Sequence, residues 1–387
     1  MSTTQSRHIV PTKVSNPYLI GTGADKSLAH VVGQDFCWKA SEDGVIESID
    51  AKNHLVFVKY SNGVKTAIDT EVKPAFNQGS GFYTINTLEL LKKYKVGSKF
   101  KKGDIIAANE GYFKEMSDVG SFGFCPGKLT KVAMMNLDNT FEDSGVISTA
   151  LSNDMASEIV SGREVVLRQN TRLIKIAKVG DQVETNTPLI VFEEVGENEK
   201  EALAALDKLS KTDSDTISKL ARSIAKAKYA GTIVAMDVHY NVEVEELHPT
   251  LRSFIQEYIG KYDKKAKSLS GIKSDELITI PNTKKVNSEK ILGNEMQGVL
   301  ITYYIKHLEP LDVGSKVTFF SGCKTIVSEV IPEGQEPYSE HRPEESIDAF
   351  LPPMSLISRM IMDVPILGWS NKILLELKKQ VIEDLDL

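Results

Sequence analysis

Short runs of apolar and β-branched residues, separated by clusters of turn-forming residues, dominate the chain. The runs 44–49 and 55–60 flank the turn-forming residues 50–53, and this pattern predicts a β-hairpin. Further runs of the same kind predict strands at 96–100, 103–107, 172–176, 189–192 and 231–238. The pattern therefore predicts a protein in which β structure predominates.

Helix-like spacing of apolar residues predicts helical segments between and after these strands. The first two lie at 88–94 and within 142–161. Downstream, amphipathic patterns predict two helices within 196–229 and one each at 251–262 and 372–385. Together, the strands and helices predict an α+β fold that is mostly β.

A turn motif, Val-Gly followed by Ser or Asp, begins at Val96, Val179 and Val313, each time ahead of a strand-like run. Glycine and a short polar residue supply a tight turn, so three copies predict related corners of a barrel or sandwich. The same hairpin pattern occurs in biotinyl and lipoyl carrier domains. Those domains need a lysine at the following turn, and Lys114, the nearest candidate here, lacks the flanking pattern.

Composition narrows the class of protein. The 387 residues suffice for two or three domains, and 41% hydrophobic content is ordinary for a soluble globular chain. No apolar run is long enough to span a bilayer, and the polar start lacks the apolar stretch of a signal peptide. Cys37, Cys125 and Cys323 show no Cys-x-x-Cys spacing, which indicates reduced thiols rather than a zinc site or disulfides.

The net charge of −7 does not by itself indicate a nucleic-acid-binding protein, but a local basic patch can coexist with acidic outer faces. Residues 313–327 (V-G-S-K-V-T-F-F-S-G-C-K-T-I-V) predict a strand, a turn at Ser321-Gly322 and a second strand. Lys316 and Lys324 would then be two cations held on a rigid β framework. The alternative is two solvated lysines that block pairing at a sheet edge.

The length of the turn decides where these lysines point. A two-residue turn at Ser321-Gly322 would pair Lys324 with Phe319 and place it on the face opposite Lys316. Convergence of the two lysines therefore requires a bulge or a longer loop.

Seven short motifs, in the same order, resemble the β subunit of multisubunit RNA polymerases. Residues 313–327 resemble the G-D-K-x-A-G-R-H-G-N-K-G-V of that family, with Lys316 and Lys324 at matching positions. Residues 348–360 (D-A-F-L-P-P-M-S-L-I-S-R-M) resemble its D-I-V-L-N-P-L-G-V-P-S-R-M, and residues 141–148 resemble its F-E-D-[SA] and the following I-x-[VI]-S. The four further motifs are Arg7 with Val10-Pro11, Gly21-Thr22-Gly23, Asn77-Gln78 and Lys102-Gly103-Asp104-Ile105. The chain departs from the family at Phe319-Phe320-Ser321, Cys323 and Pro352-Pro353.

The resemblance implies a fold and a domain order. It implies a β-subunit-like double-psi β-barrel interrupted by a flap-like insertion. Residues 1–30 would lead into the barrel, 31–162 would form a strand-rich barrel block, 163–295 the insertion, and 296–387 the return to the barrel with a C-terminal helix. Members of the family begin before Arg7 and continue beyond Arg359, so the chain resembles an interior portion of β, as in the split polymerases of giant bacteriophages.

The resemblance also implies roles for individual residues. Lys316 and Lys324 match lysines that contact phosphates at the RNA 3′ end and the incoming nucleotide. Arg359 matches an arginine that grips the triphosphate, for which its planar fork is suited. Arg7 matches an arginine near the same centre. Glu142 and Asp143 match an acidic pair that faces the second metal through water, while the residues alone also allow an ordinary acidic first turn of a helix.

The function implied is that of a subunit of a DNA-directed RNA polymerase, a nucleotidyltransferase that is inactive as the isolated chain. Nothing in the chain resembles the N-A-D-F-D-G-D loop, so Mg²⁺ would be held mainly by a partner β′-like chain. Other expected partners are β-like subunits, an initiation or promoter-recognition factor, the DNA template, the RNA transcript and nucleoside triphosphates, with no membrane. The location would be the cytoplasm of an infected bacterial host or the virion. The alternative is a catalytically degenerate barrel that serves as an assembly and nucleic-acid-binding scaffold.

Overall fold

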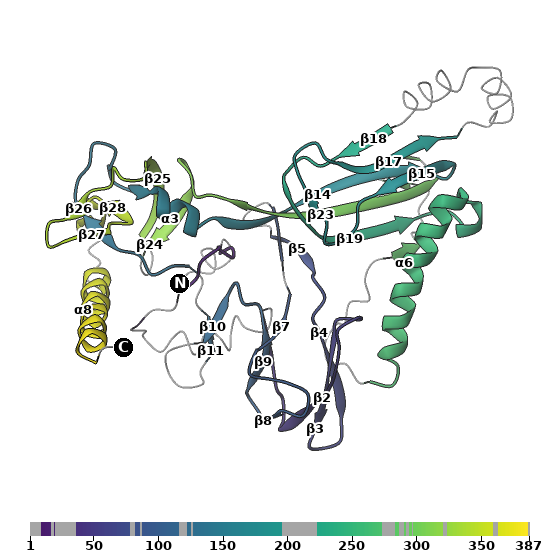
Figure 1. The fold of residues 1–387 in the computed structure, drawn as a ribbon, viewed down its shortest axis with the longest axis horizontal. Coiled ribbons are helices and arrows are strands. Elements are labelled where there is room, and N and C mark those ends of the chain that lie inside the picture. The colour runs from purple at the N-terminus through teal and green to yellow at the C-terminus, as the bar shows by residue number, and fades with distance from the viewer. Residues whose placement is uncertain are drawn as a thin grey trace.

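The computed structural model describes residues 9–16, 19, 36–77, 82–85, 87–115, 122–124, 127–195, 223–272, 283–285, 290–291, 294–295, 297–319, 323–358 and 363–385. Figure 1 shows three lobes. We call them the hairpin lobe (β1–β4 and β7–β9), the insertion lobe (β14–β20, β23 and α6) and the motif sheet (β12, β13, β24, β25 and β28). The fold is α+β and mostly β, which confirms the class predicted from the pattern of apolar residues.

The hairpin lobe contains two small sheets. Their strands are β1 (Cys37–Lys39), β2 (Gly44–Asp50), β3 (Leu55–Tyr60), β4 (Lys65–Asp69), β7 (Glu89–Leu90), β8 (Lys99–Phe100) and β9 (Ile105–Ala108). The predicted hairpin is confirmed as β2 and β3, and Ile46 and Val58 are fully buried in the core. The helix predicted at 88–94 is wrong. Glu89–Leu90 pairs with β9 instead, and the Leu91 N–H continues that pairing by donating to the Ile106 carbonyl, so contact with a neighbouring strand overrides the helical spacing.

The Val-Gly turn has the same structure in all three places. Its glycines, at 97, 180 and 314, have φ angles of +86°, +99° and +86°, in the left-handed region that favours glycine. The side chain of the next residue, Ser98, Asp181 or Ser315, accepts a hydrogen bond from the backbone N–H three residues earlier, at 2.9, 2.8 and 3.2 Å. The three copies therefore form one kind of turn, which confirms that they are related.

Each of these turns docks on a neighbouring strand through the same pair of backbone hydrogen bonds. The glycine N–H donates to one strand residue (Ile46, Ile233 or Val327), whose own N–H donates to the carbonyl of the residue after the glycine. Two further turns, at Gly103-Asp104 and Asn186-Thr187, dock in the same way but lack the Val-Gly pattern. In the third copy, this contact fixes the start of the lysine stretch against the strand that follows it.

The insertion lobe is built on two long antiparallel strands, β14 (Ser157–Arg168) and β23 (Gly298–Glu309), which pair along their whole length. β19 (Gly231–Tyr240) pairs with β23, and α6 (Pro249–Ser268) packs beside this sheet (Figure 1). The remaining strands are β15 (Thr171–Ile176), β16 (Gln182–Val183), β17 (Pro188–Glu194), β18 (Ser223–Lys226) and β20 (Thr283–Lys285). The predicted strands at 172–176, 189–192 and 231–238 and the helix at 251–262 are confirmed.

Two stretches predicted to be helical, at the edges of this lobe, contain described residues that form strands. Within 196–229, residues 196–222 lie outside the described part, but Ser223–Lys226 is strand β18, paired with β17, and is not helical. Residues 142–161 form strand β13 (Ser144–Ser148), the short helix α3 (Thr149–Asp154) and the start of β14. The boundary placed between residues 162 and 163 falls inside β14, which runs from the motif sheet into the insertion lobe.

The other elements are short, apart from α8 at the C-terminal end. They are β5 (Pro74–Asn77), β6 (Phe82–Ile85), β10 (Phe113–Glu115), β11 (Phe122–Phe124), the 3-10 helix Val244–Glu246, β21 (Lys290–Ile291), β22 (Asn294–Glu295), β26 (Tyr338–Ser339), β27 (Arg342–Ser346), α7 (Met354–Ile357) and α8 (Asp363–Asp384). The predicted C-terminal helix is confirmed as α8, which begins earlier than predicted. None of the described helices is both long and apolar enough to cross a membrane.

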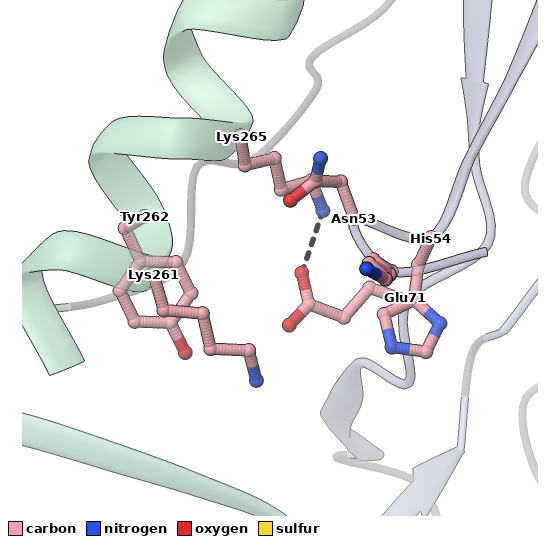
Figure 2. Close-up of a pocket in the computed structure, with 7 residues that line it drawn as sticks. Asn53, His54, Glu71, Lys261, Tyr262 and Lys265 are labelled. Atoms are coloured by element: carbon pink, nitrogen blue, oxygen red, sulfur yellow. Dashed lines mark hydrogen bonds and ion pairs between the residues drawn. The ribbon is translucent and has the colours of Figure 1, made fainter. Parts of the chain in front are cut away.

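A buried ion-pair cluster ties the insertion lobe to the hairpin lobe. Lys265 of α6 has only 3% of its side chain exposed, and its Nζ lies 2.9 Å from Asp69 Oδ1. The same Nζ lies 2.6 Å from Glu71 Oε2 (Figure 2). Asn53 adds a hydrogen bond from its side-chain amide to the Ser268 hydroxyl. A buried cation needs compensating anions, and these are supplied by Asp69 at the end of β4 and Glu71 in the loop that follows. The position of α6 therefore depends on this end of β4 and its loop.

Candidate functional site

Segments that are far apart in the sequence meet in the motif sheet. Its strand order is β12 (Val132–Met134), β28 (Ala349–Leu351), β13, β25 (Cys323–Ile331) and β24 (Lys316–Phe319). β25 and β28 flank β13 on its two sides, the first parallel and the second antiparallel. The sheet therefore brings together three of the motifs, at 141–148, 313–327 and 348–358.

The two motif lysines lie on the same face of this sheet. Phe319 pairs with Cys323 and Thr318 with Lys324, so the loop between β24 and β25 has three residues, 320–322, which lie outside the described part. Thr318 lies two positions after Lys316, and alternation along the strand gives both residues, and Lys324 opposite, the same exposed face. The two-residue turn at Ser321-Gly322 is therefore wrong.

The opposite face of the hairpin is anchored in a core. Phe319, Cys323 and Val327 are buried there against Ile147 and Leu151. Cys37 and Cys323 are buried and form no disulfide, and Cys125 lies outside the described residues. Within the described part of the chain, neither Lys316 nor Lys324 makes an ion pair. The hairpin thus carries, on its exposed face, two lysines without an ion-pair partner among the described residues, while its opposite face packs into a core.

The F-E-D-S turn borders this hairpin. The Ile326 N–H donates to the Asp143 carbonyl at 2.8 Å, and Ser144 pairs with Ile326 across the β13–β25 ladder. Glu142 and Asp143 are both exposed. They precede strand β13, not a helix, because α3 begins only at Thr149, so the reading of this acidic pair as a helical first turn is wrong.

The turn itself has a fixed backbone. The Phe141 N–H donates to Ser144 Oγ at 2.6 Å, and the Ser144 N–H donates to the Phe141 carbonyl at 3.0 Å. Glu142 has a φ of +46°, a left-handed conformation that is uncommon for a residue with a side chain and that the surrounding hydrogen bonds must hold.

The third motif docks on this turn. Ser355, in α7, donates its hydroxyl hydrogen to the Glu142 carbonyl, and the β28 strand ahead of α7 pairs with β13. The sequence analysis did not predict this contact, because the position of Ser355 is a glycine in the RNA polymerase motif that residues 348–360 resemble. Arg359 follows directly on described residue Ser358 but lies outside the described part, as does Arg7.

The remaining motifs do not enter the motif sheet in the described part of the chain. Pro11 lies beside the start of β14, where the Pro11 carbonyl accepts a hydrogen bond from the Glu158 N–H at 3.0 Å. Lys102–Ile105 forms the turn before β9 in the hairpin lobe, and Asn77 ends β5. Gly21-Thr22-Gly23 and Gln78 lie outside the described residues.

A cluster of ion pairs fastens α8 beside the motif sheet. Glu345 of β27 contacts Lys131 at 2.8 Å, Arg342 at 3.2 Å, and Lys379 of α8. Lys131 and Lys379, with Arg342, lower the pKa of the Glu345 carboxyl to about 2. Lys372 lowers the pKa of Glu376, which also pairs with Arg342. These contacts hold one side of α8 by charge.

The other side of α8 is an exposed apolar stripe. Its members recur at intervals of three or four residues and are 49–67% exposed: Ile366, Trp369, Ile373, Leu377, Val381 and Leu385. Such spacing places them along one face of the helix, and a continuous exposed apolar face marks an interaction surface.

A second candidate site is the cavity at the ion-pair cluster between α6 and the hairpin lobe (Figure 2). Its lining is Lys52, Asn53, His54, Glu71, Lys261, Tyr262 and Lys265. It encloses about 10 Å³, which is room for one water molecule at most. The cavity therefore has no capacity for a substrate.

The described carboxylates do not assemble a metal site. No group of three or more His, Cys, Asp or Glu side chains in the described part of the chain could hold a metal ion. Glu142 and Asp143 are two exposed neighbours in the sequence. Neither a protein-family model nor a curated protein matches this chain.

Proposed function

We propose that the chain is a β-like subunit of a DNA-dependent RNA polymerase and supplies the cationic side of its active centre. The observation that carries the proposal is the pairing of Thr318 with Lys324, which puts both motif lysines on one exposed face beside the F-E-D-S turn. A chance set of motif matches gives no reason for segments this far apart to meet in one sheet.

The proposal extends to the fold. The motif sheet would be the described part of a double-psi β-barrel, and β14 and β23 would lead out of it into a flap-like insertion. Barrel strands that come from both sides of a long insertion account for the parallel pairing of β13 with β25.

The chemistry is an in-line displacement at the α-phosphate of a nucleoside triphosphate. Negative charge on the triphosphate and on the primer phosphate is redistributed in the transition state, and fixed cations stabilise it. Lys316 and Lys324 would contact phosphates at the RNA 3′ end and the incoming nucleotide. Arg359 would hold the triphosphate with two parallel hydrogen bonds, and Arg7 would lie near the same centre.

Mg²⁺ would be held mainly by a β′-like partner and would supply the Lewis acid for the displacement. In this chain, Glu142 and Asp143 would face the ion through water. The left-handed backbone of Glu142, held by Ser144 and Ser355, would keep the pair in place relative to the lysine hairpin. The other partners would be further β-like chains, a promoter-recognition factor, template DNA, the transcript and nucleoside triphosphates.

The scaffold alternative predicts the same exposed α8 stripe but a different role for the cations. A scaffold needs no unpaired lysines beside an acidic turn, whereas an active centre does. We therefore expect affinity purification of the tagged chain from infected cells to recover a β′-like protein and primer-extension activity. An assembled complex that extends RNA at the wild-type rate with both Lys316 and Lys324 replaced by alanine would establish the scaffold instead.

A further inference from the structure

Phe141 is the most exposed of the large apolar side chains in the described part of the chain, with 78% of its surface accessible. It lies at the first position of the F-E-D-S turn. Leaving a phenylalanine in water forgoes the free energy of its burial, so what surrounds this ring decides whether it is a binding surface.

The ring is carried by a rigid support. The Phe141 N–H and carbonyl are both hydrogen-bonded to Ser144, whose hydroxyl also contacts the Asn139 carbonyl at 3.3 Å. Ser328 of β25 donates to the same Asn139 carbonyl at 2.6 Å, and Ser355 holds the next residue, Glu142. A platform fixed in this way loses little conformational entropy on binding.

The sheet surface beside the F-E-D-S turn is cationic and partly apolar. Ser144, Ile326 and Lys316 lie in one row across β13, β25 and β24, and Lys324 is two residues from Ile326 on the same face. Ile326 is 45% exposed. Acids also lie close by: Glu142 and Asp143 belong to the turn itself, and Glu329 of β25 accepts a hydrogen bond from the Asn139 side chain at 2.8 Å. As carboxylates they would direct phosphates away from the turn and towards the lysines.

We propose that Phe141 is the stacking platform of a single-stranded nucleic-acid site, with one base on its ring and the adjoining phosphates on Lys316 and Lys324. The inference rests on the proposed function only for the identity of the strand as RNA. Single-strand sites combine a cationic track with aromatic rings, because every unpaired base has a face that can stack. A protein partner fits less well, since it would have to desolvate two unpaired lysines inside the contact.

The test uses the purified full-length chain and a fluorescent single-stranded RNA that contains 2-aminopurine, titrated at several salt concentrations. We expect Phe141→Ala to weaken binding about five- to a hundred-fold without changing the salt dependence. Phe141→Tyr should bind like the wild type, and Phe141→Leu should stay weak because a leucine cannot stack. Lys316→Ala and Lys324→Ala should each lower the slope of log affinity against log salt by about 0.7.

The matched control is Tyr338→Ala, which removes another exposed aromatic ring, 64% accessible, in β26. It should leave binding unchanged. Because Phe141 is exposed, none of its variants removes core packing, and unchanged thermal unfolding verifies this.

Three results would overturn the inference: no binding by the wild type even at about 50 mM salt, where phosphate contacts are strong; wild-type affinity for Phe141→Ala; or full recovery by Phe141→Leu. The last two would point to a protein-docking surface. Loss of the stacking effect leaves the polymerase proposal standing, because that proposal rests on the cations. Conversely, an assembled complex without RNA synthesis removes the polymerase proposal and leaves a stacking result intact.

Discussion

Thr318 pairs with Lys324 across the β24–β25 hairpin, and this pairing gives Lys324 the same face as Lys316. Shifting the register by one residue would move Lys324 to the opposite face and bring the buried Cys323 and Val327 out of the core. The packing of the hairpin therefore fixes the position of its cations.

The shared face predicts that the two lysines act together. In the assembled enzyme, we expect Lys316→Ala and Lys324→Ala each to slow extension at saturating nucleotide. The double variant should cost less than the sum of the single losses, because both lysines would neutralise the same group of phosphates. Single-turnover extension on an RNA–DNA scaffold measures this, and Lys378→Ala, an exposed lysine of α8, is the control. Strict additivity would show that the lysines contact separate groups.

Replacing Arg359 should weaken nucleotide binding, whereas replacing either lysine should slow extension at saturating nucleotide. Arg359→Ala should raise the nucleotide concentration for half-maximal extension, since about 1.5–3 kcal/mol of charge-assisted contact is lost. Arg359→Lys should recover only part, because a point charge cannot replace the planar fork. Nucleotide-dependent elongation kinetics distinguish these outcomes, with promoter binding as the control. Wild-type kinetics for Arg359→Ala would remove this residue from the active centre.

The apolar stripe of α8 should be a subunit contact in the complex. Replacing Trp369, Ile373 and Leu377 with alanine should weaken assembly with the β′-like partner, because the partner would lose apolar surface to bury. Analytical ultracentrifugation of the reconstituted complex reports the change, and Lys378→Ala again serves as control. Unchanged assembly would show that the stripe faces another molecule or solvent.

Local sequence signals were sufficient where one short segment decides the structure. The β2–β3 hairpin, the Val-Gly turns and α6 each depend on alternation, a glycine or helical spacing within a few residues. The period over Val146 and Ile147 failed because residues 145–148 are all buried in a strand flanked by neighbours on both sides. A continuous buried run looks the same in a strand and in a buried helix.

The candidate site depended on contacts that no short segment encodes. The three-residue loop between Phe319 and Cys323 follows from which residues pack into the core, and the Ser355–Glu142 contact joins positions 213 residues apart. Sequence motifs could indicate which segments carry chemistry. Only the register of the sheet could put the lysines on one face beside the acidic turn.

Glu345 predicts an acid-dependent loss of stability. Its ion pairs depress its pKa from 4.5 to about 2, so they stabilise the fold above pH 4.5, and this contribution disappears as the pH falls from 4.5 towards 2. Glu345→Gln should therefore lower the free energy of unfolding by about 1 kcal/mol at pH 7, since the lysine partners are partly exposed and screened. Urea unfolding between pH 7 and pH 3 measures it. A difference between variant and wild type that does not shrink at low pH would contradict this account.

The free energy of unfolding should be sensitive to replacement of Lys265, which joins the insertion lobe to the hairpin lobe, because its charge is buried with Asp69 and Glu71. Lys265→Met keeps the volume but leaves Glu71 without its cation and Asp69 with Lys73 as its remaining ion-pair partner, and we expect a loss of about 3–5 kcal/mol in the free energy of unfolding. Adding Asp69→Asn and Glu71→Gln should recover much of it, since the uncompensated charges are then gone. Lys264→Met, on an exposed position of the same helix, should change stability by less than about 0.5 kcal/mol. Urea unfolding and hydrogen exchange of α6 measure both effects. Equal losses for Lys264→Met and Lys265→Met would mean that α6 is held by apolar packing and not by the buried ion pairs.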